Sequence, residues 1–557
     1  MHAAQPPAAP AQGCEVRALS EQAFADYDFE SPPPSLILEG EERVRVTELR
    51  VRQQRVFQEE TPWFKRLANR YHVQTRERVL TESLPFDLGD AINARHLAEA
   101  ERILRLKPYL FEAAVVISRR CAGADGLDEV RVDVIARDVW TLNPRLVLTR
   151  TGSQTDFGAG VSDSNWFGTG IAASIAYISD EDRSGISVVY QDQNLLGSRW
   201  RLNSLLIDSD DGHLADIILE RPFFALDTRY SLGMRVRDNR REQGLFFLSD
   251  ELFEFDVDAQ FAALYAGRQL YRSKRAIGRV LAGVAHSDQR FEFPTGFPGG
   301  DPDVDRRFTY PYLAYQQVAD QFVERVNLDR IQRTEDIALG TALYAEVGYA
   351  PDAFGSDGDH WLGNASLRHT RWLSRRALMS IGGRFEGRYD RDERRSEEVI
   401  ASAFAAFQFN HAQRFSLLAR GSYFYTNNLP VDRQLLLGGD VGLRGYPNRY
   451  QSGDRGYLLT VEERYYSDLY PFEMFRLGAA VFADVGRVSY RNDAPAWVPA
   501  ERSADEFGTL ANVGFGLRLE STRTRRDRIL HVDFAVPLVD GPNVKGLEVT
   551  VVAKQSL

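Results

Sequence analysis

The chain has 557 residues and a formal net charge of −11, a size above one ordinary domain and a charge that argues against a nucleic-acid-binding protein. Its 43 Gly, 33 Phe and 23 Tyr, against 4 Met and 2 Cys, are typical of an all-β chain. No run of 18 apolar residues is present, so we predict no transmembrane helix. A spanning β-strand needs only about 9–11 residues, every second one apolar, so a transmembrane barrel stays compatible with this composition.

The first part of the chain, residues 1–38, is rich in Ala and Pro, and we predict that it is a disordered tail. It has neither a basic start nor an apolar stretch, so it is not a signal peptide. For an outer-membrane protein this means that the signal has been removed or that the true start lies elsewhere.

The two cysteines, Cys14 and Cys121, have no metal-ligand spacing around them. A disulfide between them would form in an oxidising compartment. Two unpaired thiols are an equally open alternative at this stage.

Residues 40–141 predict a small α+β domain with the element order β-α-α-β-β. In the first helix, Trp63, Leu67 and Tyr71 recur at every fourth position and fall on one face. The alternative reading of this module is a spacer domain without a binding role. The expected elements are a strand at 44–51, helices at 63–71 and 91–106, and strands at 114–119 and 130–135.

From residue 144 to 557, short segments of alternating apolar and polar residues recur between turns rich in Asp, Gly and Asn. This pattern predicts a transmembrane antiparallel β-barrel. Counting the segments gives a number nearer twenty strands than sixteen. No fixed-period repeat is present, which counts against a propeller, whereas a soluble sandwich remains the structural alternative.

One stretch inside the predicted barrel, residues 436–447, is too rich in glycine for a helix or a regular strand. It contains Gly442, Leu443, Arg444, Gly445 and Tyr446. An arginine fork favours a fixed bidentate acceptor, so we predict a structured loop that presents Arg444 to a buried carboxylate. The alternative is an ordinary long loop between two strands.

Several of these segments together resemble the BamA/TamA superfamily of outer-membrane proteins, in the form of a bacterial surface antigen barrel with one POTRA domain. Residues 40–141 are similar to a POTRA domain in element order and position. The sequence Leu443-Arg444-Gly445-Tyr446 matches the superfamily's (V/L/I)-R-G-(F/Y) motif, and Phe482 to Gly486 resembles its F-x-D-x-G strand. The residues similar to the superfamily's early-barrel turn are Asn165, Trp166, Gly168 and Gly170.

This resemblance implies a barrel of 16 strands in the bacterial outer membrane, with the POTRA domain in the periplasm. A loop around residues 426–454 would fold into the lumen, and Asp484 would be the lock partner of Arg444. Glu462 and Glu520 would be further acceptors. The chain departs from the superfamily at Leu557, where Phe or Trp is usual.

The resemblance also implies a function in outer-membrane protein assembly or translocation. The POTRA domain would capture an unfolded outer-membrane or secreted client protein, and a loop-gated barrel with a weak seam between first and last strands would insert or pass it. Other partners would be the lipid bilayer and a periplasmic or inner-membrane protein. The alternatives are a two-partner secretion pore, usually with two POTRA domains and a plug helix, and a passive porin.

No catalytic signature supports an enzyme. The sequence lacks a Gly-x-Ser-x-Gly elbow, a His-Glu-x-x-His helix motif and a phosphate-binding loop. We therefore expect no enzymatic activity, no cofactor, no metal and no nucleic-acid partner.

Overall fold

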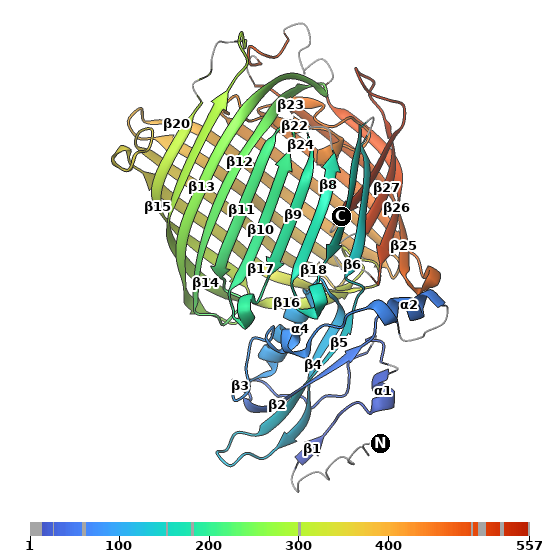
Figure 1. Cartoon of the computed structure of the whole chain (residues 1–557). Helices are drawn as coiled ribbons and strands as arrows, with labels where there is room; N and C mark the ends of the chain where they lie inside the picture. The colour runs from blue at the N-terminus through green and yellow to red at the C-terminus, as the bar shows by residue number, and fades with distance from the viewer. Residues whose placement is uncertain are drawn as a thin grey trace.

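The computed structural model describes residues 14–554 except 26, 30, 58–62, 152–153, 180–182, 299–301, 303, 492–493, 500–507 and 524–528. A small α+β domain at the N-terminal end of the chain lies against one end of a large closed barrel (Figure 1). We call the barrel end that faces this domain the proximal end and the opposite one the distal end.

The N-terminal domain is a five-stranded sheet in the order β1-β4-β5-β2-β3. Its interior is built from apolar side chains that alternate along the strands, such as Val44 and Val46 or Val130, Val132 and Val134, all at most 1% exposed. The strands are β1 (Cys14–Val16), β2 (Val44–Gln54), β3 (Ala91–Ile92), β4 (Leu110–Cys121) and β5 (Glu129–Asp138).

The helices of this domain are α1 (Glu21–Ala25), α2 (Trp63–Tyr71), α3 (Glu77–Thr81) and α4 (Ala94–Arg105). Helix α4 begins three residues later than predicted because Asn93 caps it, its side chain accepting from the His96 amide. The short α3 and β3 were not predicted. No described helix is long and apolar enough to cross a membrane.

The prediction of a disordered tail is wrong for residues 14–38. Cys14 and Cys121 form a disulfide, and β1 pairs with β4 directly at this bridge. The Arg52 guanidinium donates to the Leu19 carbonyl oxygen at 2.8 Å, which holds the following turn against β2. Composition alone predicted disorder because it does not register a covalent tie between distant residues; residues 1–13 lie outside the described part.

The barrel closes through antiparallel neighbours in chain order, from β6 to β28 and back to β6. A further pair, β22 (Leu435–Leu437) and β23 (Gln451–Gly453), forms a separate two-stranded sheet. The barrel strands are β6 (Leu142–Thr151), β7 (Gln154–Asp163), β8 (Ala172–Ser179), β9 (Ser184–Asp192), β10 (Arg201–Ser209), β11 (Gly212–Arg221), β12 (Tyr230–Phe247), β13 (Asp250–Arg272), β14 (Ala276–Glu292), β15 (Arg306–Ala319), β16 (Gln321–Val326), β17 (Thr334–Ala350), β18 (His360–Ser374), β19 (Ala377–Asp390), β20 (Arg395–Ala412), β21 (Phe415–Asn427), β24 (Arg455–Tyr466), β25 (Phe475–Ser489), β26 (Leu510–Ser521), β27 (Ile529–Pro537) and β28 (Glu548–Lys554).

Among the described residues, β15 and β16 both pair with β17 and are separated only by Asp320, so they act as one interrupted strand. The 21 barrel segments therefore make twenty strands, and the sixteen implied by resemblance is wrong. Among the described residues the seam is short: β28 meets β6 at Val551 opposite Arg150, whereas β6 and β7 pair over ten residues.

The outer face of the barrel is apolar. On β26 the side chains of Val513, Phe515 and Leu517 are about half exposed. Asn512 and Arg518, on the opposite face of the strand, are buried on the inner side of the barrel. Exposed Leu, Val, Ile and aromatic side chains recur in the same way around the barrel. A lipid bilayer covers such a surface, so the predicted fold class, a transmembrane antiparallel barrel preceded by an α+β domain, is confirmed.

Candidate functional site: a luminal lock and a proximal floor

The predicted loop leaves β21 after Asn427 and returns at β24, and its residues 428–454 include β22 and β23. Leu443, Tyr446 and Tyr450 are fully buried, so the loop lies inside the barrel. The glycines are required by space: a Cβ on Gly445 would lie 2.6 Å from the Asn512 Cβ, and Gly442 has a φ of +112°.

Arg444 of this loop contacts three side chains of the barrel wall. Its Nε and Nη2 donate to Oδ2 and Oδ1 of Asp484, each at 2.9 Å, and its Nη1 donates to Oε2 of Glu462 at 2.7 Å. The guanidinium carbon lies 3.3 Å from the centroid of the Phe482 ring. We call Arg444, Asp484, Glu462 and Phe482, together with the neighbouring Arg464, Arg518 and Asp533, the lock.

The charges around Arg444 are balanced. Three arginines face three carboxylates, and each of the six is at most 7% exposed. Arg464 Nε donates to Glu462 Oε1 at 3.1 Å, and Arg518 Nη1 donates to Asp533 Oδ1 at 2.5 Å. Buried charges are tolerated only when they are paired and hydrogen-bonded, so this cluster holds the loop as one unit. The six are Arg444, Arg464, Arg518, Glu462, Asp484 and Asp533.

A second contact holds the aromatic of the motif. The Tyr446 hydroxyl donates to the Ala511 carbonyl oxygen at 2.9 Å and accepts from the Val539 amide at 3.2 Å. Tyr446 therefore ties the loop to the distal ends of β26 and β27, next to the lock on the same wall.

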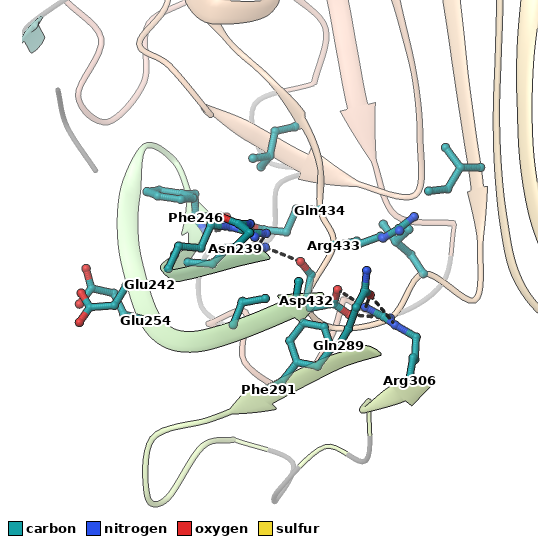
Figure 2. Close-up of a pocket in the computed structure, with 18 of the residues that line it drawn as sticks. Asn239, Glu242, Phe246, Glu254, Gln289, Phe291, Arg306, Asp432, Arg433 and Gln434 are labelled. Carbon is teal, nitrogen blue, oxygen red and sulfur yellow. Dashed lines mark hydrogen bonds and ion pairs between the residues drawn. The ribbon is translucent and has the colours of Figure 1, made fainter. Parts of the chain in front are cut away.

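The start of the loop is anchored on the opposite wall (Figure 2). Arg306 of β15 binds both carboxylate oxygens of Asp432, at 3.0 and 2.7 Å, and the pair is buried. Gln243 of β12 donates to the Asp432 carbonyl oxygen at 2.5 Å, and Gln434 exchanges hydrogen bonds with the Phe246 backbone. The loop thus spans the lumen from wall to wall, beside a cavity of about 790 Å³.

At the proximal end, a hairpin that the sequence did not reveal closes the lumen. It comprises residues 321–339, and we call it the floor hairpin; β16 lies across the barrel end that faces the N-terminal domain (Figure 1). The carbonyl oxygen of Leu328 at its tip accepts from Gln408 at 3.1 Å, Arg464 at 2.9 Å and Tyr466 at 3.3 Å. Arg464 therefore contacts the lock and the floor hairpin at once.

Glu520, expected as an acceptor for Arg444, instead serves the floor hairpin. Its Oε2 accepts from the Ile331 amide at 2.7 Å, and its Oε1 lies 3.5 Å from Arg330 and 3.6 Å from Arg333. Glu520 is the second-last residue of β26 and so lies near the proximal rim, whereas Asn512, at the other end of β26, pairs with Asp484. Strand alternation predicts the face but not the height along the barrel axis, which is why this expectation failed.

The N-terminal domain holds the other end of the floor hairpin. Arg105 of α4 donates to both carboxylate oxygens of Asp336, at 3.0 and 2.6 Å, and to Glu324 at 2.6 Å. The Arg102 guanidinium lies 3.7 Å above the Phe322 ring. Burial acts to lower the pKa of Arg105, but the carboxylates of Asp336, Glu101 and Glu324 outweigh it and raise the pKa above its usual value, so Arg105 stays charged. We call Arg105 with Asp336 and Glu324 the latch.

The early-barrel turn forms a joint between the two parts of the molecule. Asn165 is buried, donates to Thr75 Oγ1 at 2.7 Å and accepts from the Gly170 amide at 2.6 Å. The Arg76 amide donates to the Gly168 carbonyl oxygen at 2.9 Å, and Trp166 remains about half exposed. A Cβ on Gly168 would lie 2.2 Å from the Gln74 carbonyl oxygen, so only glycine permits this approach.

A second joint of the same kind was missed. Asn194 begins a turn at Leu195–Gly197, and its side chain lies 3.4 Å from the Glu82 carbonyl oxygen of the N-terminal domain. Both joints begin with the same hydrogen bond, from the Asn amide to the Asp two residues earlier. The repeated D-x-N-x-x-G pattern at 163–168 and 192–197 is the signal that could have revealed the pair.

One group of described residues has metal-ligand types. His360, Asp390 and Glu397 bring one potential ligand atom each within 4.8 Å of the others. The Glu397 Oε2 already accepts from Arg388 at 2.5 Å and lies 3.1 Å from His360 Nε2. A guanidinium on the shared oxygen competes with a cation, so we assign this group to ion pairing.

Comparison with known proteins yields structural likenesses only. No family model and no curated protein matches the chain. It is similar to CdiB from Acinetobacter baumannii (14% identity, TM-score 0.45, covering 92% of this chain and 73% of that one). BamA from Haemophilus ducreyi lacking POTRA domains 1-3 (13%, 0.39, 92% and 84%) and CdiB from Escherichia coli (15%, 0.43, 92% and 76%) are similar too. All three TM-scores lie below 0.5.

Proposed function

We propose that this protein is an outer-membrane assembly and translocation factor. Its POTRA-like domain captures an unfolded client protein in the periplasm, and its loop-gated barrel inserts or passes the client. The observation that carries the proposal is the lock, in which Arg444 meets Asp484 and Glu462 inside the lumen. A buried ionic cluster that ties a loop across a bore has no use in a passive pore, which requires a permanently open path.

Client capture is supported by a free sheet edge. Strand β2 is 11 residues long, but its outer neighbour β3 pairs with it only at Val44 and Arg45. The Val46 backbone is bonded to Gly89 and Asp90, and among the described residues the rest of that edge has no strand beside it. An extended client segment would add there as a further strand, with backbone hydrogen bonds supplying the affinity.

Release into the bilayer is supported by the seam. Strands β28 and β6 meet at Val551 and Arg150, next to strand pairs of seven and ten residues. A short seam leaves backbone groups that a client strand pairs with as it folds. Folding of the client in the lipid would then supply the free energy, without nucleotide or metal.

A two-partner secretion pore is the second candidate. It is favoured by one observation, the loop that spans the lumen between Arg306 and the lock, because a route through the lumen needs a plug that a route through the seam does not. The two candidates differ in where the client leaves the barrel.

The proposal is tested by exchanging the charges of the lock. Arg444→Glu, Asp484→Arg and the double exchange are reconstituted in planar bilayers, and single-channel conductance is recorded. We expect each single exchange to raise conductance and the double exchange to lower it again, since removing either partner exposes an unpaired buried charge. Arg420→Glu is the matched control, because Arg420 lines a second luminal cavity together with Arg444 and Glu462, and its guanidinium stacks on Phe404.

Insertion is measured with the same proteins in liposomes. A urea-unfolded small outer-membrane barrel is added, and its folding is followed by its heat-modifiable gel mobility. Wild type should accelerate folding over empty liposomes. Four proteins of equal conductance, together with no acceleration by wild type, would instead leave the passive barrel as the better description.

A further inference from the structure

We propose that the floor hairpin, residues 321–339, is a gate over the proximal mouth of the barrel, and that Arg105 of the N-terminal domain holds it shut. This inference rests on the proposed function, because it assigns to that barrel the element that admits a client. It differs from the lock in place and in chemistry.

The tip of the gate is pre-formed. The amides of Leu328, Asp329 and Arg330 all donate to the Glu335 carboxylate at 2.9 to 3.2 Å. The Gln332 amide donates to the Asn327 side chain at 2.6 Å and closes the turn. Because these bonds lie within the hairpin, the tip keeps its shape when it leaves the barrel.

The seal between tip and barrel combines few apolar side chains with exchangeable polar contacts. Leu328 and Ile331 are at most 4% exposed, and Ile331 reaches Gly478 on β25, where a Cβ would come within 3.3 Å of it. Polar contacts run from the tip to Glu520, Arg464, Gln408 and Tyr466, and from the Gln332 side chain to the Ser467 carbonyl oxygen. Water replaces polar contacts of this kind at low net cost, so the seal can open reversibly.

A hinge lies where both strands of the hairpin leave the barrel wall. β15 ends at Ala319 and β16 begins at Gln321, and on the facing strand Gly340 has a φ of +104°. Arg95 of the N-terminal domain binds Asp320 at this break, with Nη2 to Oδ2 at 2.9 Å. The same domain therefore grips the hinge and the stem of the gate.

Charge explains how the domain controls the gate. The stem carries Glu324 and Asp336 as cross-strand partners, and Arg105, which also donates to Glu101 of its own helix at 2.5 Å, supplies the cation between them. Movement of the N-terminal domain on client binding withdraws this guanidinium and leaves two like charges side by side. Their repulsion favours the open hairpin, and Arg333, which donates to the Phe111 carbonyl oxygen, loses its hold on the domain at the same time.

The experiment measures access to the tip directly. Both native cysteines are in the disulfide, so Gln332→Cys introduces a single thiol at the tip, which a membrane-impermeant maleimide labels in bilayer-embedded protein. We expect slow labelling in the otherwise wild-type chain. Arg105→Ala should speed it about tenfold or more, because it removes charge-assisted hydrogen bonds.

The controls separate gating from misfolding. Arg119→Ala breaks an ion pair with Glu48 in the same domain, away from the hairpin, and should leave labelling slow. The double variant Glu324→Gln with Asp336→Asn removes the latch from the hairpin side and should also speed labelling, even if Arg105→Ala disturbs the domain. Rapid labelling in wild type, or equal rates in all variants, would overturn the gate.

The readout needs no client. A barrel that labels as expected but fails to fold clients would refute the proposed function and keep the gate. Client folding with unchanged labelling would do the reverse.

Discussion

The lock and the latch are both built around an arginine that binds more than one carboxylate, with Glu101 as a further partner of Arg105, but they differ in their access to water. In the lock, the side chains of Arg444, Asp484 and Glu462 are 8% exposed or less. In the latch, Arg105 is equally buried, yet the Glu324 side chain is 58% exposed. Separating two buried charges leaves each unpaired away from water, at a high cost in free energy. A carboxylate that already contacts water loses little free energy when its partner leaves. The comparison indicates that the latch releases first and the lock later.

The largest expected effect comes from breaking the lock on one side. Arg444→Met leaves Asp484 and Glu462 buried without a cation, and we expect a loss of about 3–5 kcal/mol in the stability of the folded loop. Arg444→Met combined with Asp484→Asn should lose less than Arg444→Met alone, since fewer unpaired charges remain. The midpoint of heat-modifiable gel mobility measures both, and equal midpoints for all three chains would contradict the lock.

A second, smaller effect is expected where the loop packs against the wall. Gly445→Ala places a Cβ 2.6 Å from the Asn512 Cβ, and overpacking of this kind costs about 1–3 kcal/mol. Gly546→Ala is the matched control, because a Cβ there meets nothing within 4 Å. Limited proteolysis should cleave the 428–454 loop faster in Gly445→Ala only; the same rate in both variants would mean that the loop has room to shift.

These differences show what the sequence carries and what it does not. The barrel was predictable because alternation and turn residues are local signals, whereas the limits of the luminal loop came from the family resemblance. The Arg444–Asp484 pair was predictable from the resemblance, because the segments 443–446 and 482–486 both match motifs of the same superfamily. Arg464, Arg518 and Asp533 were not, since nothing local distinguishes a lock residue from any other charged residue that faces the lumen.

The floor hairpin was missed for a related reason. Its residues 321–326 form a strand that pairs with β17 just as β15 does, and only the pairing of β15 and β16 with one neighbour reveals that the chain leaves the wall at Asp320. The number of strands shows the same limit. Counting alternating segments gave a number near twenty, whereas the resemblance implied sixteen. Contacts between distant segments decide these features, and periodicity does not contain them.

The smallest expected effect tests the latch side of the comparison through pH. Lys107 follows α4 at the interface with the barrel, donates to Gln193 at 2.7 Å and faces Arg199. Burial, with a smaller contribution from Arg199, lowers its pKa to about 8, against about 10.4 when the domain is released. The protonated form is therefore disfavoured in the docked state, so docking strengthens as pH rises from about 8 to about 10.

Lys107→Met removes this titration, and we expect its docking to change less over the same range. The urea midpoint of domain release, followed by tryptophan fluorescence, measures the difference between wild type and variant at each pH. Since Glu101, raised by burial to a pKa of about 7, is already charged above pH 8, it contributes equally to both chains. Parallel plots of the urea midpoint against pH would show that Lys107 contacts water in the docked state. The interface at the latch would then be more hydrated than its contacts indicate.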